Sequence, residues 1–212
     1  MLLLLDFDGT LTDHDTLDLL VAEHAPAVWL EAEQALTDGT MTLNEVIAFE
    51  FGHVHTTLDE ALAVLRERVA LRPGLEELIE FCRERFIDPV VVSSGFHEVI
   101  EPMLAWSGVK LPVVAHSAAF SREGTTVTFL ERETCAICGE PCKRMDLDRL
   151  AAGRPIAYVG DGWSDRCGAQ VADLVFARGT LAEHLARQGV PYVPFDDLID
   201  VREGLRRYLA PA

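Results

Sequence analysis

Long apolar runs are missing from this chain of 212 residues. A helix that crosses a bilayer needs about 20 apolar residues in succession, and no segment approaches that length. The four leucines at residues 2–5 follow no basic leader and run directly into Asp6, so they do not have the pattern of a signal segment. We therefore expect a soluble, cytoplasmic protein.

Positive charge is also scarce. The chain carries 18 Lys and Arg residues against 35 Asp and Glu residues, which gives a formal net charge of −17. Such a charge repels nucleic acid and anionic membranes, so we expect neither as a partner. A small anionic ligand needs a local cation that reverses this field, and lysine occurs only at Lys110 and Lys143.

Cysteine is present, but not in the pattern of a disulfide framework. There are five cysteines, and three of them, Cys135, Cys138 and Cys142, lie within one short segment. Small secreted domains held by disulfides usually carry an even number of spaced cysteines. The pattern therefore argues against a secreted disulfide scaffold.

Apolar residues make up 49% of the chain and are arranged in short runs. Three continuous runs, at residues 2–8, 89–94 and 155–161, end in polar or glycine-rich residues and are typical of central parallel strands. Helical patterns alternate with these strands, which predicts an α/β fold: a Rossmann-like parallel sheet flanked by helices, with right-handed crossovers. Weaker strand patterns lie at residues 111–117, 125–130, 173–177 and 191–195, and helical patterns at residues 94–108, 180–189 and 196–209.

Residues 13–72 interrupt the alternation, because only helical patterns occur there. Thr42 and Thr57 are each followed three residues later by glutamate, which is the sequence signature of a capping box. We predict a core formed by residues 1–12 and 73–212 and a helical cap formed by residues 13–72. The insertion leaves from the carboxyl end of the first strand, where open α/β sheets bind ligands, which favours a lid over helices that only pad the sheet.

Acidic side chains follow two of the predicted central strands. Asp6 and Asp8 are two residues apart, so strand alternation predicts that they point to the same side. Asp161 and Asp165 follow the strand at residues 155–161. Carboxylates this close repel one another unless a cation or a proton intervenes, and hard oxygen ligands suit Mg²⁺.

These motifs, taken in order, resemble those of the haloacid dehalogenase superfamily of phosphatases. The sequence DFDGTLT at residues 6–12 resembles the opening motif of that superfamily, and Ser93, Lys143 and the segment GDGWSD at residues 160–165 follow in the expected order. Within the superfamily, the chain is most similar to the phosphoserine-phosphatase-like branch. The cysteine-rich run and the segment at residues 172–201 resemble the methylthiopentenyl-phosphate phosphatases of methionine salvage.

The resemblance implies a Mg²⁺-dependent phosphomonoesterase that acts on a small phosphorylated metabolite. Asp6 would be the nucleophile that forms an aspartyl-phosphate. Asp8 would protonate the leaving alkoxide and then deprotonate the attacking water, and crowding by Asp6 and Asp161 would keep it partly protonated. The metal would be held by the side chains of Asp6 and Asp161 and by the backbone carbonyl of Asp8, with Asp165 in a supporting role.

The resemblance also implies the groups that bind the phosphoryl oxygens. Ser93 would donate to one of them, assisted by the backbone N–H groups of Ser94 and Gly95 at a helix start, where Ser94 also suits a helix cap. Lys143 would neutralise the phosphate and the nucleophile together. Thr10 would have a positioning or capping role.

Two features depart from a simple assignment. Trp163 stands where the resembled pattern has a small residue, and either lining the pocket or packing under the cap would explain it. The run from Cys135 resembles a zinc knuckle, with Cys142 as a possible third ligand, but a structural zinc site needs four ligands. The other candidates, Cys167, Cys82 or a histidine such as His116, have no knuckle spacing. A cysteine-rich run without metal is therefore favoured, with a zinc site and a Cys135–Cys138 disulfide as the alternatives.

Other functions remain open at this point. A dehalogenase shares the nucleophile but needs neither a carboxylate at Asp8 nor a metal ligand at Asp161. An inactive binding or regulatory module on the same fold is the alternative outside catalysis, although the motif residues are all present. The substrate is expected to be of the methylthiopentenyl-phosphate or phosphoserine type, and phosphoethanolamine or phosphocholine is the alternative.

Overall fold

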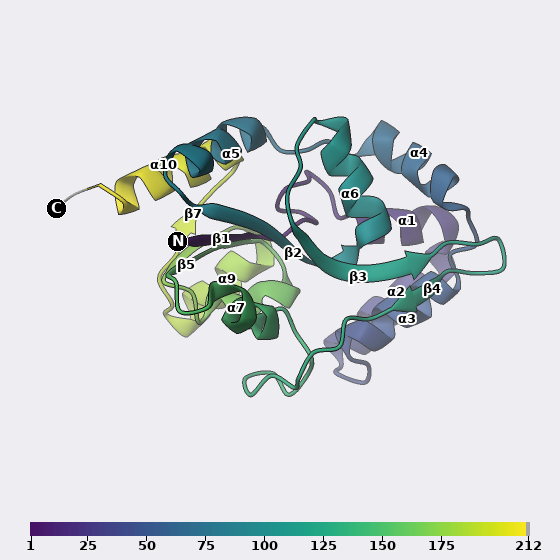
Figure 1. Ribbon diagram of the computed structural model, residues 1–212. Helices are drawn as coiled ribbons and strands as arrows, with labels where there is room; N and C mark the ends of the chain where they lie inside the picture. Colours follow the sequence, from purple (N-terminus) through teal and green to yellow (C-terminus); the bar gives the residue numbers. More distant parts are fainter. Residues whose placement is uncertain (211–212) are drawn as a thin grey trace.

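The computed structural model describes residues 1–210, which form an α/β fold around one seven-stranded sheet of order β4-β3-β2-β1-β5-β6-β7 (Figure 1). Neighbouring strands pair in parallel, except that β3 and β4 are antiparallel. The predicted fold class and all of the predicted strands are confirmed. The strands are β1 (Leu2–Leu5), β2 (Asp88–Phe96), β3 (Val113–Ala119), β4 (Thr126–Thr128), β5 (Ile156–Gly160), β6 (Leu174–Ala177) and β7 (Val193–Pro194).

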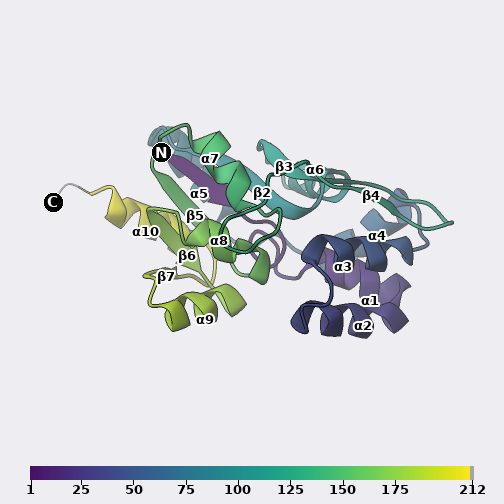
Figure 2. The same cartoon turned by 90° about the horizontal axis from the view of Figure 1, so that it is seen from below.

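The leucines of β1 serve both faces of the sheet. Leu3 and Leu5 belong to the core cluster under one layer of helices, and Leu2 and Leu4 belong to the cluster under the other layer. All four are buried, as expected for a central parallel strand covered on both sides. The first layer is α5 (Leu75–Glu84), α6 (His97–Trp106) and α10 (Leu198–Tyr208) (Figure 1). The second layer is α7 (Arg144–Ala151), α8 (Arg166–Ala169) and α9 (Gly179–Gln188), of which α8 is labelled in Figure 2.

Four further helices lie together beside one end of the sheet (Figure 2). They are α1 (Thr16–His24), α2 (Pro26–Thr37), α3 (Leu43–Gly52) and α4 (Leu58–Arg68). The capping boxes predicted at Thr42 and Thr57 are both formed, each with the glutamate three residues later. The division into a core of residues 1–12 and 73–212 and a cap of residues 13–72 stays a prediction.

Two element boundaries differ from those that the sequence suggests. β1 ends at Leu5, because the chain turns at residues 8–10, so Asp6 and Asp8 lie beyond the strand and strand alternation does not set their directions. β2 continues to Phe96, and α6 begins only at His97. The prediction that Ser94 caps this helix is therefore wrong, since Phe96 occupies the N-cap position.

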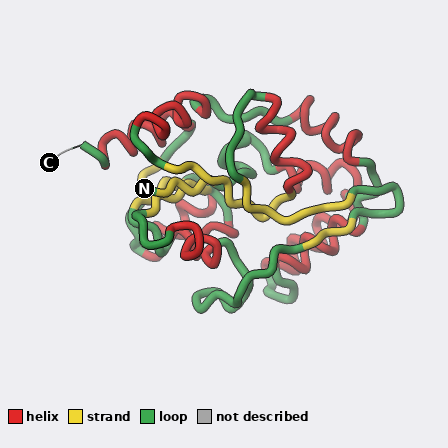
Figure 3. The backbone as a smooth tube through the Cα atoms, viewed as in Figure 1, coloured by secondary structure: helices red, strands yellow, loops and turns green. Residues whose placement is uncertain are grey.

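A long loop connects β4 to α7 (Figure 3). Residues 129–143 contain no helix or strand, and one isolated bridge pairs Thr134 with Pro141. Loops of this length without secondary structure are uncommon and usually have a functional reason. Among residues 1–210, no helix has the length and the apolar character needed to cross a bilayer.

Candidate active site

The order of the strands brings the motif residues together. β1 lies between β2 and β5 in the sheet, so the segment that follows β1 has the end of β2 on one side and the segment that follows β5 on the other. Ligands of open α/β sheets bind at this carboxyl edge. Asp6, which follows β1, and Ser93, near the end of β2, are both buried, while Asp161, which follows β5, is partly exposed.

Lys143 lies at the centre of a buried ion-pair cluster. Its Nζ is 2.5 Å from Oδ1 of Asp6 and 2.8 Å from Oδ1 of Asp165, and the three side chains are 1%, 5% and 0% exposed, respectively. Burial lowers the pKa of Lys143, but the charges of Asp165 and Asp6 outweigh this effect and raise the pKa above its usual value. The lysine therefore stays protonated between the two carboxylates.

Asp165 is a fully engaged acceptor. Its Oδ1 accepts from Lys143 and from the hydroxyl of Tyr158 (2.8 Å), and its Oδ2 accepts from the backbone N–H groups of Asp161 (3.1 Å) and Gly162 (3.0 Å). Burial raises its pKa, but Lys143 and these hydrogen bonds bring the pKa below its usual value. Asp165 thus holds Lys143 and the loop after β5 in place.

Asp6 keeps one carboxylate oxygen free of protein donors. Its Oδ1 accepts from Lys143 and from the backbone N–H of Phe7 at 2.7 Å. Within residues 1–210, no hydrogen bond reaches its Oδ2. Burial and the charge of Asp165 raise the pKa of Asp6, and Lys143 opposes them. Oδ2 is therefore the oxygen available to a metal ion or to an electrophile.

Asp161 is held against the turn that follows β1. Its Oδ1 accepts from the hydroxyl of Thr10 at 2.6 Å. Burial and the nearby Asp165 raise the pKa of Asp161 to about 6. The turn approaches closely because Gly9 has φ +69° and a Cβ at this position would lie 2.3 Å from Oδ2 of Asp161. Only glycine fits both demands.

Asp8 points towards α1 and β2. Its Oδ1 accepts from the backbone N–H of Thr16 at 2.9 Å and from the Thr16 hydroxyl at 2.5 Å, and its Oδ2 accepts from the Ser93 hydroxyl at 3.5 Å. Burial and then the charge of Asp15 raise the pKa of Asp8 to about 7. Crowding by Asp6 and Asp161, the cause expected from the sequence, is not among the main causes of this shift.

Ser93 connects Asp8 to the end of β2. Its Oγ accepts from the backbone N–H of Gly95 at 2.8 Å. That N–H is therefore engaged with Ser93 in this structure and is not free for a ligand. Ser94 faces a separate space, the pocket described next.

A narrow pocket opens beside Lys143. Arg132 and Arg166 line it together with Lys143, while Asn44 of α3 contributes from the predicted cap. Lys143 is paired with Asp6 and Asp165, and Arg132 is paired with Asp146, so Arg166 is the cation of this pocket without a carboxylate partner among residues 1–210. Its charge suits an anionic ligand. The remaining lining residues are Leu43, Ser94, Cys138, Glu140, Pro141, Cys142 and Ser164.

Trp163 supports one of these cations. The guanidinium of Arg166 lies 4.0 Å from the centroid of the Trp163 ring, and Nη1 of Arg166 donates to the Trp163 carbonyl at 2.9 Å. The ring also meets His184 of α9 edge to face, with 5.8 Å between the ring centroids. Trp163 is 50% exposed and is not among the residues that line the pocket beside Lys143. Its ring and carbonyl orient Arg166, which does line that pocket.

The carboxylate group fits a divalent cation. Asp6, Asp161 and Asp165 each offer an oxygen, and these oxygens all lie within 4.8 Å of one another. Because Asp165 already accepts four hydrogen bonds, Asp6 and Asp161 are the side chains with free oxygens for an ion. A hard dication at this place would lower the cost of burying them together.

A second acidic group lies beyond Asp8, on α1 and α3. Asp15 caps α1, Asp18 lies in its first turn and Glu50 lies on α3. Glu50 is 5% exposed, and its Oε1 has no hydrogen-bond partner among the described residues. Burial, then Asp18, Glu33 and Asp15, raise the pKa of Glu50 to about 8. This group would favour a positively charged ligand.

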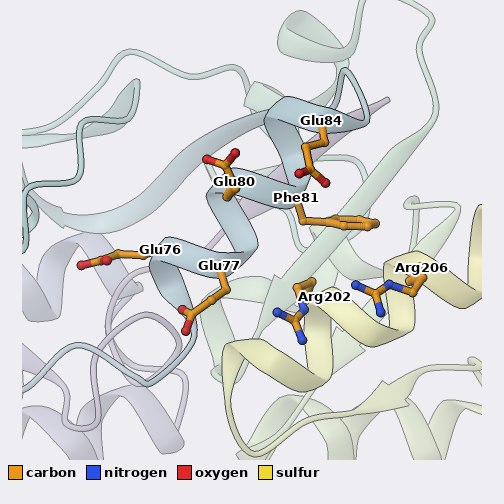
Figure 4. A pocket seen from close by; sticks show the side chains of 7 residues that line it. All are labelled: Glu76, Glu77, Glu80, Phe81, Glu84, Arg202 and Arg206. Atoms are coloured by element: carbon orange, nitrogen blue, oxygen red, sulfur yellow. The ribbon is translucent and has the colours of Figure 1, made fainter.

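A shallow hollow lies away from these residues, between α5 and α10 (Figure 4). Arg202 and Arg206 of α10 face it from one side, and the ring of Phe81 lies 5.8 Å from the guanidinium of Arg206. It contains none of the motif residues. The acidic residues around it are Glu76, Glu77, Glu80 and Glu84 of α5.

Several residues of the site escaped the sequence argument. Thr16, Tyr158, Arg132 and Arg166 bind or flank the motif residues, but no motif includes them. A polar tyrosine tip inside the apolar run at residues 155–161 is the one local signal that points to a buried partner. The others depend on contacts between segments far apart in the chain.

Residues 3–170 match the family described as haloacid dehalogenase-like hydrolase. A protein of Brevibacillus brevis named 2-hydroxy-3-keto-5-methylthiopentenyl-1-phosphate phosphatase is 28% identical over 206 residues, which cover 95% of this chain and 93% of the relative. A protein of Geobacillus kaustophilus with the same name is 29% identical over 214 residues, with coverage of 98% and 96%.

Solved structures agree on the fold. A phosphoserine phosphatase that carries an analogue of the phospho-aspartyl intermediate has a TM-score of 0.70 at 21% identity, and the match covers 97% of both chains. The phosphoserine phosphatase of T. onnurineus has a TM-score of 0.70 at 22% identity and covers 97% of this chain and 93% of its own. Together with the sequence matches, these findings confirm the predicted family and the predicted phosphatase class.

Proposed function

The chain belongs to the haloacid dehalogenase-like hydrolases, and we propose that it is a Mg²⁺-dependent phosphomonoesterase that works through a phosphorylated Asp6. The observation that carries the proposal is the buried contact of 2.5 Å between Nζ of Lys143 and Oδ1 of Asp6. This contact engages Oδ1 of Asp6 and leaves Oδ2 free for a ligand. It also places the ammonium of Lys143 beside the point where an anionic phosphoryl group would bind. Phosphoryl transfer depends mainly on such positioning and charge neutralisation.

The side chains divide the reaction between them. Oδ2 of Asp6 attacks phosphorus, and the bond between phosphorus and the ester oxygen breaks. Asp8 donates its proton to the departing alkoxide, and it then removes a proton from the water that attacks the aspartyl-phosphate and releases inorganic phosphate. The hydrogen bonds from Thr16 and Ser93 hold Asp8 for both steps.

The side chains of Asp6 and Asp161 would hold the magnesium ion, with the backbone carbonyl of Asp8 as a further ligand. Bound there, the ion would supply positive charge that lets an anionic nucleophile and an anionic phosphate approach each other. Thr10 orients Asp161 for this role, and Asp165 holds the loop that carries it. Ser93 and the backbone N–H of Ser94 would complete the phosphate site on the side of β2.

For the substrate, we propose a small phosphorylated metabolite of the methylthiopentenyl-phosphate type. The support is the name shared by the relatives from Brevibacillus brevis and Geobacillus kaustophilus, which match this chain over nearly its whole length. We propose that the protein works in the cytoplasm.

A specific observation favours a second candidate. Asp15, Asp18 and Glu50 form an acidic group beyond Asp8, and the side chain of Glu50 is buried without a partner among residues 1–210. A substrate that carries an amine or a quaternary ammonium, such as phosphoserine, phosphoethanolamine or phosphocholine, would pair with these carboxylates. The methylthiopentenyl phosphate offers no such charge.

Turnover of p-nitrophenyl phosphate tests the reaction. Release of p-nitrophenol is expected with Mg²⁺, should fall to background with EDTA, and should be abolished in Asp6→Asn. Asp13→Asn, which changes an exposed acid of the same segment, is the matched control and should keep its activity. Turnover that survives both EDTA and Asp6→Asn would contradict the proposal.

A panel of phosphomonoesters then separates the two substrate classes. Comparison of kcat/KM for neutral and for amine-bearing esters should favour the methylthiopentenyl phosphate, with Glu50→Gln having little effect on it. A preference for the amine-bearing esters that is lost in Glu50→Gln would establish the second candidate instead.

A further inference from the structure

A group of cysteines outside the carboxylate site points to a second metal. The sulfur atoms of Cys135, Cys138, Cys142 and Cys167 all lie within 4.8 Å of one another. The first three come from the loop between β4 and α7, and Cys167 comes from α8. All five cysteines of the chain are free thiols here, and Cys82, on α5, is the one outside the group.

We propose that these four cysteines bind a structural zinc ion. Zinc takes four thiolates in a tetrahedron at about 2.3 Å, which sets the sulfur atoms about 3.8 Å apart. The four sulfur atoms lie within 4.8 Å of one another, so they need to move only slightly closer together to reach this distance. Four protein ligands leave no open position for water or substrate, which is the arrangement of structural sites. The zinc ion would take no chemical part in the proposed phosphatase reaction.

The backbone around Cys135 and Cys138 is already shaped for a metal. Thr134 and Pro141 pair as an isolated antiparallel bridge, so the segment between them is a small hairpin. Within it, the N–H of Cys135 donates to the carbonyl of Glu140 at 3.0 Å. The N–H of Ile137 donates to Sγ of Cys135 at 3.4 Å, a bond that stabilises a thiolate.

Gly139 completes the turn. It has φ +77°, and a Cβ built at this position meets nothing within 4 Å, so the backbone conformation and not crowding accounts for glycine. Its N–H donates to the carbonyl of Cys135 at 2.9 Å and closes the loop over the two sulfur atoms. A glycine directly after the second cysteine is thus explained by the same hairpin.

Two arginines near the cysteines would offset the negative charge of a zinc–thiolate site. Four thiolates around a zinc ion carry a net charge of −2, which is costly in a partly buried place unless cations lie near. Nη1 of Arg144 is 3.9 Å from Sγ of Cys135. Arg166, the neighbour of Cys167 in the sequence, lines the pocket that Cys138 and Cys142 also line.

The site would position the catalytic lysine. Lys143 and Asp165 form an ion pair at 2.8 Å. Lys143 directly follows the proposed ligand Cys142, and Asp165 lies two residues before the proposed ligand Cys167, so both partners are close in the sequence to a zinc ligand. The loop at residues 129–143 has no regular structure of its own. A metal that crosslinks it to α8 would hold Lys143 in register, as metal clips that close long loops do.

Metal content and ligand type test the proposal directly. Protein expressed in zinc-containing medium and desalted without a chelator should hold one zinc ion per chain by mass spectrometry. X-ray absorption should show four sulfur neighbours at about 2.3 Å. Protein free of zinc, zinc with oxygen or nitrogen neighbours only, iron in its place, or a disulfide within the group would each overturn the assignment.

Variants locate the ion. Cys167→Ala should lose at least nine-tenths of the zinc, while the matched control Cys82→Ala and the carboxylate variant Asp161→Asn should retain it. Cys138→His should retain zinc with three sulfur neighbours and one nitrogen neighbour, which keeps the proposal testable where the alanine variant fails to fold. Full retention of zinc by Cys167→Ala would refute the site.

Discussion

Replacement of Lys143 by methionine is the most informative single change at the carboxylate site. Lys143→Met keeps the length of the side chain and removes the ammonium that lies 2.5 Å from Asp6 and 2.8 Å from Asp165. Two carboxylates are then left buried beside each other with no cation between them. The loss of one partner of a buried ion pair costs about 3–5 kcal/mol.

Activity should fall further than stability alone explains. Removal of one electrostatic stabiliser of a transition state lowers kcat about 100-fold or more, and Lys143 is the cation that contacts the proposed nucleophile. The assays are steady-state turnover of p-nitrophenyl phosphate with saturating Mg²⁺ and urea unfolding of the same preparations without metal. Lys110→Met is the matched control, since Lys110 is exposed and is the other lysine of the chain.

The pH dependence checks the cause of the instability. Without the ammonium, the pKa values of Asp6 and Asp165 rise, so the folded variant binds more protons than its unfolded chain near neutral pH. Its stability deficit relative to the wild type should therefore shrink as the pH falls from 7 to 5. A variant with kcat within tenfold of the wild type and an unchanged urea midpoint would refute the central role given to Lys143.

Three further predictions concern the neighbours of this cluster. Thr16→Val removes the hydroxyl that donates to Asp8, so it should raise the pKa of Asp8 and shift the corresponding limb of the pH–rate profile by about one unit. Thr16→Ser keeps the hydroxyl and should leave this limb in place. An unmoved limb in the valine variant would contradict the role given to the hydroxyl. Burial raises the pKa of Glu50 from an ordinary value of 4.5 to about 8, so the wild type loses stability as the pH rises from 4.5 to 8. In urea unfolding, Glu50→Gln should therefore be more stable than the wild type by about 1–3 kcal/mol at pH 9 and nearly equal to it at pH 4. Tyr158→Phe leaves Asp165 with one donor fewer and should lower the free energy of unfolding by about 1–2 kcal/mol; no change by urea titration would show that the hydroxyl is not a significant donor.

Local sequence patterns predicted most of the elements. The continuous apolar runs at residues 2–8, 89–94 and 155–161 became central strands, because a strand covered on both faces buries every side chain. The capping boxes at Thr42 and Thr57 formed as expected, because a capping box is complete within four residues. Patterns of this kind need no information from the rest of the chain.

Boundaries were less predictable, because they depend on tertiary contacts. β1 stops at Leu5 since the turn at Gly9 packs against Asp161, and β2 extends to Phe96, whose ring contacts Phe51 of α3 at 4.7 Å. Neither partner is close in the sequence. The nearby charge that most raises the pKa of Asp8 was also not predicted, because it belongs to Asp15 and not to Asp6 or Asp161.

The sequence alone determined the fold class, the family and the identity of the acidic motifs, since these depend on local periodicity and on short motifs in a set order. The family resemblance predicted that Lys143 lies beside Asp6, but tertiary structure decided the further groups that meet there. The crossovers of the sheet bring Lys143 between Asp6 and Asp165, which are 137 and 22 residues away from it, and bring Cys167 to the other three cysteines. Such pairings follow from how the whole chain packs, so no local pattern encodes them.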